Sequence, residues 1–334
     1  MDFKVSNIRF LVFFFALVLA FTACKDEKKS NPKTAETTSK NVRKVPKFQM
    51  DSAYQFLEKQ VSFGPRYPGT EGHRQIVDYL STKMGDYADK VIKQDFEVSF
   101  LDVKSANATN VIGIFNPDQN KRILLAAHFD SRKIAEKDTN EELQDDPILG
   151  ADDGASGVGV LLEIARLIKE NGVDVGVDII FFDAEDNGLD GDNWCLGSKY
   201  WGQNPHVKNY KAEFGILLDM VGAKNAEFGR EGFSQQNAPK IMDKVWRMAQ
   251  NMGYGNYFLD FDAGGINDDH YYVMNYRKFP MIDIINRQRN QHPSGFGAYH
   301  HTHDDNLDVI DKNTLRAVGK VTTAVVYNFS NGTF

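Results

Sequence analysis

Acidic residues and histidines gather in separated segments of this chain. The segment 150–157 places two aspartates among small residues directly before an amphipathic helical pattern, the segment 181–186 contains three acids, and two histidines stand together at 300–301. Carboxylate oxygens and an imidazole nitrogen from separate loops are suitable ligands for a divalent metal. A further glutamate beside one of the ligands would supply a proton shuttle. Together these residues indicate an enzyme.

The composition is that of a folded protein with one large hydrophobic core. The chain has 334 residues, 42% of them hydrophobic and 25% charged, which is ample for one large core. Its formal net charge is -7, and it shows no basic stripe interleaved with aromatic residues. A nucleic-acid partner is therefore not expected.

The N-terminus is typical of a targeting segment. A short basic region precedes an apolar stretch at 10–21 that is shorter than a membrane-spanning helix requires, so we interpret 1–23 as a signal peptide. Thr22, Ala23 and Cys24 resemble a bacterial lipobox, which predicts cleavage before Cys24 and a lipid anchor on it. An ordinary secretory signal with a chance cysteine is the alternative.

The lipobox predicts an extracytoplasmic lipoprotein, and Lys25, Asp26 and Glu27 directly after Cys24 resemble the surface-export tag of some Gram-negative lipoproteins. We therefore expect a lipoprotein of the outer membrane, facing either the periplasm or the outside. Residues 24–47 are rich in polar residues and are predicted to be a tether, because they cannot bury enough apolar surface. The catalytic domain is predicted at 48–334. The chain has two cysteines, so with Cys24 lipidated no intrachain disulfide can form. Cys195 is predicted to be a buried structural thiol rather than a nucleophile.

Alternating strands and helices must position the acids and histidines. The apolar patterns predict strands at 91–98, 109–115, 123–128, 177–183, 216–219 and 281–285, and helices at 71–84, 155–170, 239–252 and 314–327. This order predicts a single three-layer α/β/α domain with a mixed, mostly parallel central sheet.

Three of these strands end in polar residues that could do chemistry. The apolar run 123–127 leads into His128, the run 177–182 leads into Asp183, and the run 216–218 leads into Asp219. In parallel sheets ligands gather at the carboxyl ends of the strands. We therefore expect one site at this edge of the sheet.

Several separated segments, in this order along the chain, resemble those of a known family. The motifs at 128–131, 150–155, 183–186 and 301–302 resemble those of the zinc aminopeptidases of family M28, and in detail those of its glutaminyl cyclases (glutaminyl-peptide cyclotransferases). The resemblance runs from about residue 51 to the C-terminus. It implies the zinc-aminopeptidase-like fold and one zinc ion per chain, held by Asp153, Asp186 and His301.

The same resemblance implies the catalytic residues. It makes Glu185 the general acid and base, with Asp219 and Asp268 completing a carboxylate network. Aminopeptidases of this fold generally have serine at the position of Asp268, which favours a cyclase. Two departures stand out: Asp186 replaces the glutamate of the animal cyclases, and His300 replaces an aromatic residue. His300 is therefore an alternative metal ligand.

The implied reaction is cyclisation of an N-terminal glutamine of a peptide or protein to pyroglutamate. The α-amine attacks the side-chain amide, ammonia leaves, and zinc would polarise the amide carbonyl. Crowded carboxylates hold a shared proton, which would bring the pKa of Glu185 near the working pH. Trp194 is the preferred aromatic wall of the substrate pocket, ahead of Trp201 and Phe296. The acidic loop 134–146 is interpreted as a solvated charge run.

Two other functions remain open. A two-zinc M28 aminopeptidase would use His128 and Asp219 for a second metal, with Asp153 bridging. A lipoprotein that keeps the fold as a non-catalytic binding module is the third hypothesis, which the complete set of metal-competent side chains disfavours. We expect a monomer that contacts the membrane only through its lipid anchor.

Overall fold

The computed structural model describes residues 42–189, 193–289 and 295–334. The predicted signal peptide, Cys24 and most of the predicted tether lie outside these residues. No helix among the described residues is both long enough and apolar enough to cross a membrane.

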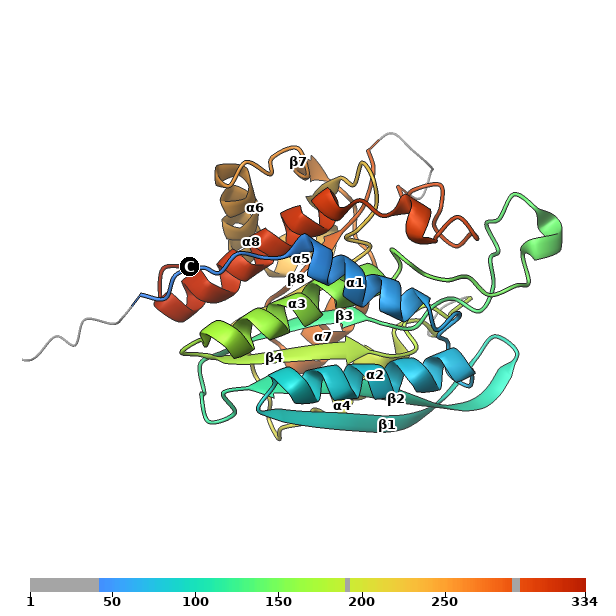
Figure 1. The fold of residues 1–334 in the computed structure, drawn as a ribbon, viewed down its shortest axis with the longest axis horizontal. Helices are drawn as coiled ribbons and strands as arrows, with labels where there is room; N and C mark the ends of the chain where they lie inside the picture. The colour runs from blue at the N-terminus through green and yellow to red at the C-terminus, as the bar shows by residue number, and fades with distance from the viewer. Residues whose placement is uncertain (1–41, 190–192, 290–294) are drawn as a thin grey trace, which may run out of the picture. The chain divides into compact units, whose positions relative to one another are not determined.

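A six-stranded sheet forms the centre of the domain (Figure 1). Its strands, in spatial order, are β1 (Lys90–Phe100), β2 (Val103–Phe115), β4 (Gly176–Phe182), β3 (Arg122–His128), β5 (Gly215–Asp219) and β8 (Met281–Ile285). The last four run parallel, whereas β2 is antiparallel to both β1 and β4. The mixed, mostly parallel sheet predicted from the sequence is confirmed.

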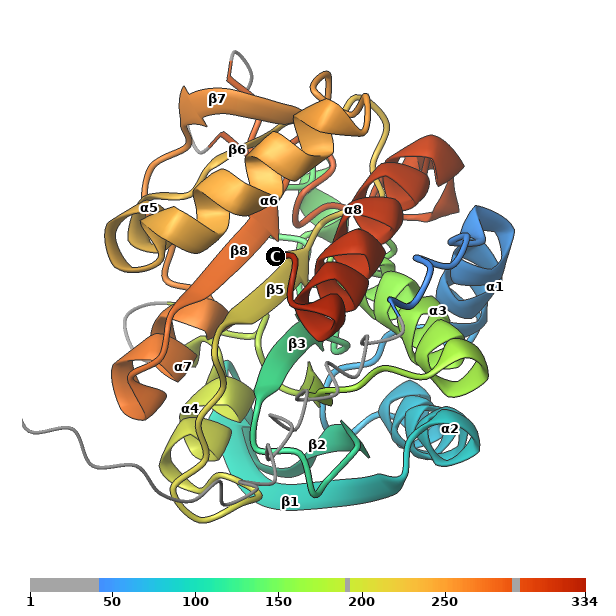
Figure 2. The ribbon, with the colours of Figure 1, turned by 90° about the vertical axis from the view of Figure 1, so that its left-hand side faces the viewer.

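Helices cover both faces of this sheet (Figure 2). One face carries α1 (Met50–Val61), α2 (Glu71–Tyr87), α3 (Ala155–Asn171), α6 (Pro239–Asn251) and α8 (Lys312–Asn331), and the other carries α4 (Leu196–Gln203) and α7 (Asp269–Arg277). The short helix α5 (Gly232–Asn237) and the two-stranded sheet of β6 (Phe228–Arg230) and β7 (Phe258–Asp262) lie near the β8 edge of the large sheet. Short 3-10 turns occupy Glu141–Leu143 and Leu307–Val309.

Side chains of the central strands alternate between the two covered faces. In β3, Leu125 and Ala127 belong to the larger core under α1, α3 and α8, while Leu124 and Ala126 belong to the smaller core under α4 and α7. Both sets are fully buried. Because both faces are covered, these strands are mostly apolar along their length, and the exceptions are the buried Asp178 in β4 and Asp283 in β8.

The folded domain begins earlier in the chain than the sequence predicted. The folded part includes residues before the predicted start at 48, because Arg43 pairs with Asp174 and exchanges hydrogen bonds with Asn331 near the C-terminus. Helix α1 begins after Gln49, and Asp51 in its first turn pairs with Lys312 of α8.

Sequence patterns did not predict the short elements α4, α5, α7, β6 and β7. These helices have six to nine residues and these strands three to five. Such lengths offer too few apolar repeats for a periodic pattern to stand out. Two of these elements matter for the site, because α4 and α7 begin beside it.

Candidate active site

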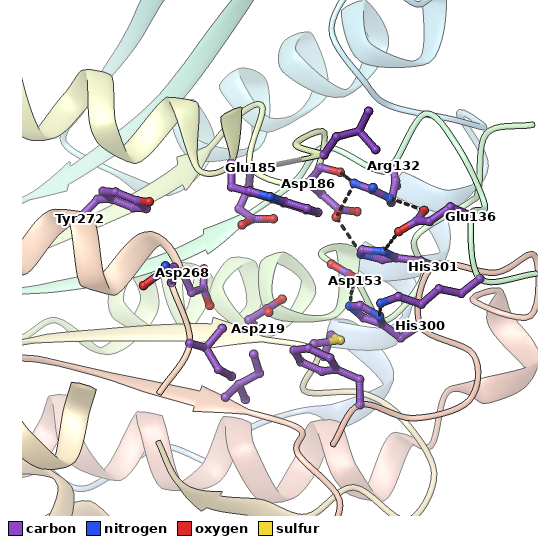
Figure 3. A pocket seen from close by; sticks show the side chains of 18 residues that line it. Arg132, Glu136, Asp153, Glu185, Asp186, Asp219, Asp268, Tyr272, His300 and His301 are labelled. Atoms are coloured by element: carbon purple, nitrogen blue, oxygen red, sulfur yellow. Dashed lines mark hydrogen bonds and ion pairs between the residues drawn. The ribbon is translucent and has the colours of Figure 1, made fainter. Parts of the chain in front are cut away.

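The residues able to do chemistry line one cavity, at the carboxyl ends of β3, β4 and β5. Its volume is about 580 Å³. All seven residues assigned a role from the sequence line it: Asp153, Glu185, Asp186, Trp194, Asp219, Asp268 and His301. Figure 3 shows the carboxylates of Glu185, Asp219 and Asp268 facing a common space, with the histidines beside them. The structure thus brings together side chains that are up to 148 positions apart, since Asp153 and His301 stand at the ends of this set.

The loop after β4 aims Glu185 and Asp186 into the cavity. Asp130 is fully buried and accepts hydrogen bonds from the backbone amides of Glu185 (2.9 Å) and Asp186 (3.2 Å) and from the side chain of Asn187 (3.0 Å). Preceding them, Ala184 adopts a left-handed backbone with φ of 54°. The loop therefore turns sharply at the strand end and is held there by one carboxylate.

Asp153 lies in the turn that precedes α3. Its backbone amide and that of Asp152 donate to the carboxylate of Asp305, at 3.2 and 2.8 Å. Its Oδ1 is 2.9 Å from Nε2 of His128 at the end of β3. A Cβ on Gly154 would lie 2.5 Å from that same nitrogen, so only glycine lets the turn approach His128 this closely.

Two carboxylates hold the imidazole of His301. Its Nε2 is 3.1 Å from Oδ1 of Asp186, and its Nδ1 is 2.6 Å from Oε1 of Glu136. Glu136 is itself held by Arg132, whose Nε donates to Oε2 at 2.7 Å. A histidine whose Nδ1 is fixed by a carboxylate presents Nε2 in a set direction, which is the usual arrangement of a metal-ligating histidine.

The residues around His301 fit a small divalent metal. Ligand atoms of Asp153, His300 and His301 lie within 4.8 Å of one another. Oδ2 of Asp186 is buried and has no hydrogen-bond partner among the described residues. An orphaned carboxylate oxygen beside carboxylate and imidazole ligands is what a bound zinc ion would satisfy.

His300 remains an alternative ligand. Its Nε2 is 3.8 Å from Oδ2 of Asp153, and its ring stacks on His301 with 3.7 Å between centroids. Its Nδ1 accepts a hydrogen bond of 2.7 Å from Lys137, so Nε2 is the nitrogen that faces the carboxylate. Phe296 covers the other side of the ring at 4.2 Å.

A second group with metal-ligand geometry shares Asp153. Nε2 of His128 lies 2.9 Å from Asp153 and 3.1 Å from Asp219, and the ligand atoms of these three residues lie within 4.8 Å of one another. This is the set that the two-zinc alternative requires. The ligands present can therefore hold one or two ions.

The three carboxylates opposite the histidines have raised pKa values. Burial raises the pKa of Glu185 well above its usual value, and the charges of Asp268 and Asp186 add to this effect. Burial and the charges of Asp153 and Asp268 raise the pKa of Asp219 to about 8, against the hydrogen bond from His128. Burial likewise raises the pKa of Asp268. Carboxyl groups this close together bind and release protons as a unit.

An aromatic wall bounds the cavity beside His301. The ring of Trp194 stacks on His301 (6.1 Å, 13° between planes), and the guanidinium of Arg132 lies 4.8 Å from the Trp194 ring. The indole packs onto Gly188, where a Cβ would be 2.5 Å away. Phe296 also lines the cavity, whereas Trp201 is fully buried in the core under α4 and is no part of it.

The interpretation of the loop 134–146 as only a solvated charge run is wrong. Glu136 and Lys137 both line the cavity, and each fixes the Nδ1 of one histidine. Glu136 is separated by 165 residues from the histidine it contacts. No local pattern distinguishes it from the other acids of the loop, so only the fold could reveal the pairing.

Comparisons with known proteins agree with this geometry. The model of peptidase family M28 matches residues 110–326. A glutaminyl cyclase structure from Tannerella forsythia is 48% identical, covers 85% of this chain and 99% of its own, and superimposes with a TM-score of 0.82. A Zn-dependent exopeptidase structure from Parabacteroides distasonis is 46% identical, covers 85% of this chain and 100% of its own, and has a TM-score of 0.83.

The chain is also similar to a more distant, curated relative. The glutaminyl-peptide cyclotransferase of Bothrops jararaca is 23% identical over 302 residues, covering 80% of this chain and 78% of the relative. The family model spans more than half of the chain and includes every residue that lines the cavity. This chain therefore belongs to peptidase family M28.

Proposed function

We propose that this protein cyclises N-terminal glutamine of peptides and proteins to pyroglutamate, with release of ammonia. The observation that carries the proposal is the gathering of Glu185, Asp219 and Asp268 opposite Asp153, Asp186 and His301 in one cavity. The likeness to glutaminyl cyclases, at 48% identity over nearly the whole of one such chain, supports it.

One zinc ion per chain would be held by Asp153, Asp186 and His301, with His300 as the alternative to one of them. Bound there, zinc would polarise the side-chain amide carbonyl of the substrate and make its carbon a better electrophile. Glu136 and Asp130 would keep two of the ligands in place, through His301 and through the backbone of Asp186.

Glu185 is the proton carrier in this proposal. A bond forms between the α-nitrogen and the side-chain carbonyl carbon, and the bond from that carbon to the amide nitrogen breaks. Glu185 takes the proton that the α-amine loses and returns it to the departing nitrogen, which leaves as ammonia. No water is consumed, and both nitrogens belong to the same residue, so one carboxylate between them is enough.

The remaining walls fit the aliphatic part of a glutamine. Met220, Ile266, Ile285 and Phe296 line the cavity together with Trp194. Apolar walls around a few polar groups are typical of small-molecule sites. Trp194 is our proposed substrate-binding residue, because its ring is held in place by Arg132, His301 and Gly188.

A two-zinc aminopeptidase is the competing function, and His128 and Asp219 are placed for it. The two functions are distinguished by supplying a glutaminyl amide and a leucyl amide to the purified protein. A cyclase releases ammonia and pyroglutamyl amide but no free amino acid, and binds about one zinc per chain. Free leucine together with about two zinc ions per chain would instead establish the aminopeptidase.

Glu185→Gln is the matched variant for the same assay. It keeps the shape of the side chain but cannot carry the proton, so we expect kcat to fall roughly 10²- to 10⁴-fold. Zinc content should stay unchanged, since Glu185 is not one of the proposed ligands. Full activity of this variant would refute the proposed role of Glu185.

We also propose that the protein is an extracytoplasmic lipoprotein of the outer membrane, acting as a monomer. The support is the sequence around Cys24, which lies outside the described residues. In that compartment the enzyme would meet exported or processed chains that begin with glutamine. Mapping pyroglutamate N-termini in cells carrying Glu185→Gln would identify these substrates.

A further inference from the structure

Cys195 is a buried cysteine that contacts the proposed proton carrier. Its side chain is fully buried, and its Sγ lies 3.0 Å from Oε1 of Glu185 and 3.6 Å from the carbonyl oxygen of Asn267. Burial raises the pKa of the Cys195 thiol well above its ordinary value, so the sulfur keeps its hydrogen. The thiol is therefore a donor facing a carboxylate.

The backbone around Cys195 is tied to the loop that carries Glu185. The amide of Cys195 donates to the carbonyl of Glu185, and the amide of Leu196 donates to that of Ala184, both at 2.9 Å. A Cβ on Gly197 would lie 2.3 Å from the carbonyl oxygen of Asp183, so glycine allows α4 to begin directly against the strand end. The thiol and the carboxylate are thus held at a short, fixed separation.

The backbone conformation at residue 195 would favour glycine. Cys195 has φ of 55° and ψ of 39°, in the left-handed region that residues with a side chain seldom adopt. A cysteine at such a position, beside a reacting group, indicates that its side chain contributes something that glycine could not.

We propose that Cys195 is a positioning residue for Glu185. Its thiol donates to Oε1 of Glu185 and holds the carboxylate so that Oε2 faces the two nitrogens of the substrate. This inference rests on the proposed function, because it requires Glu185 to be the proton carrier. Without the thiol, the carboxylate would rotate about its side-chain bonds and spend less time in the productive orientation.

The alternative is that Cys195 has a purely structural role, which predicts the opposite order of activity for the alanine and serine variants. A buried thiol that only fills space behaves as a small apolar group, so alanine should replace it better than serine. A positioning thiol should instead be replaced well by serine, whose hydroxyl also donates, and poorly by alanine. Glycine removes the donor while suiting the left-handed backbone, so it separates loss of the hydrogen bond from damage to the fold.

The test compares Cys195→Ser, Cys195→Ala and Cys195→Gly with the unaltered, zinc-loaded protein, using glutaminyl amide as substrate. Thermal unfolding and zinc content are measured for each variant. We expect the serine variant to keep kcat within about threefold, and the alanine and glycine variants to lose about tenfold or more, with KM changed less than about twofold. The melting temperature of the glycine variant should not fall below that of the alanine variant.

Full kcat in the glycine or alanine variant, or an equal loss in the serine variant, would overturn the inference. Glu185→Gln, assayed in parallel, separates this failure from failure of the proposed function. If Glu185→Gln is inactive while Cys195→Gly has full kcat, only the role of Cys195 is wrong. If Glu185→Gln is fully active, the assignment of Glu185 is wrong, and the role of Cys195 is refuted with it.

Discussion

At the scale of single residues, the site depends on side chains that hold other side chains. His301 and Glu185 face the cavity, but Glu136 and Cys195 determine how they face it. Asp130 performs the same task through backbone amides of Glu185 and Asp186. Because a metal ligand or a proton carrier must be held to within a fraction of an ångström, these supporting contacts are part of the chemistry.

Replacing Glu136 tests whether its contact with His301 strengthens metal binding. Glu136→Gln keeps the size of the side chain but weakens its hold on Nδ1 of His301, so we expect zinc affinity to fall about 10- to 100-fold. Competition with a chromogenic chelator measures this directly, without any assay of turnover. Glu141→Gln is the matched control, since Glu141 is exposed on the same loop and does not line the cavity. Equal zinc affinity in both variants would rule out the role of Glu136.

At the scale of secondary-structure elements, close packing of α3 on the sheet positions Asp153. A Cβ on Gly157 would lie 2.2 Å from the carbonyl oxygen of Leu218 in β5 and 3.0 Å from Cβ of Ala127 in β3. The helix therefore rests directly on the two strands whose ends carry His128 and Asp219. A larger residue would push the helix, and the turn before it, away from the site.

Substituting this glycine should cost stability. We expect Gly157→Ala to lower the free energy of unfolding by about 1–3 kcal/mol, because the obstructing atom belongs to the backbone of the sheet. Gly85→Ala is the control: Gly85 is an exposed helical glycine of α2 where an added Cβ would meet no atom within 4 Å, so it should gain about 0.5–1 kcal/mol. Urea unfolding monitored by circular dichroism distinguishes the two. A Gly157→Ala protein as stable as the original would contradict the packing argument.

Glu231 joins the short elements that follow β5 in the chain. Its buried carboxylate accepts hydrogen bonds from the backbone amides of Phe233, Ser234 and Ile266 and from the ring of His270, at 2.7–2.9 Å. Burial alone would raise its pKa, but the hydrogen bond and charge of His270 and the amide donors lower it to about 2. One carboxylate thus ties the start of α5 to the loop before α7 and to α7 itself.

The pH dependence of stability follows from this lowered pKa. A carboxyl group whose pKa is lower in the folded state stabilises the fold above its unfolded-state pKa, near 4.5, and this contribution disappears as the pH falls towards 2. We expect Glu231→Gln to lower the free energy of unfolding by about 2 kcal/mol at pH 7. Chemical denaturation of both proteins between pH 7 and pH 2.5 should show that the difference shrinks below pH 4.5. A constant difference across this range would exclude the ionic contribution.

At the scale of the whole molecule, the catalytic machinery is confined to the described domain. Every residue that lines the cavity falls between Arg132 and His301. The predicted lipid anchor at Cys24 lies far from these residues in the chain. Anchoring and catalysis should therefore be separable by mutation.

A Cys24→Ala variant tests this separation. Without the cysteine no lipid can be attached, so we expect the protein to move from the membrane fraction to the soluble fraction of cells. Its kcat on glutaminyl amide should stay within about twofold of the anchored enzyme, since no cavity residue has changed. Membrane fractionation with an activity assay on both fractions gives the answer. An unchanged membrane fraction would favour the ordinary secretory signal over the lipobox.

The sequence by itself determined the fold class and the residues able to do chemistry. Buried parallel strands are continuous apolar runs, and polar residues such as His128 and Asp219 stand out where they end. The motifs around Asp153, Glu185 and His301 are local, so they could be recognised without knowing the fold. All three lie in one cavity, and their roles remain predictions for the experiments above.

Only the tertiary structure decided which side chains hold these residues in place. Glu136 contacts His301 across 165 positions, whereas Cys195 contacts Glu185 within the segment between β4 and α4, and no periodic pattern encodes either contact. The structure also removed Trp201 from the pocket, because α4 turns that ring into the core rather than towards the site. The physical reason is the same in each case: a side chain's type is set by its own position, but its neighbours are set by how distant segments pack.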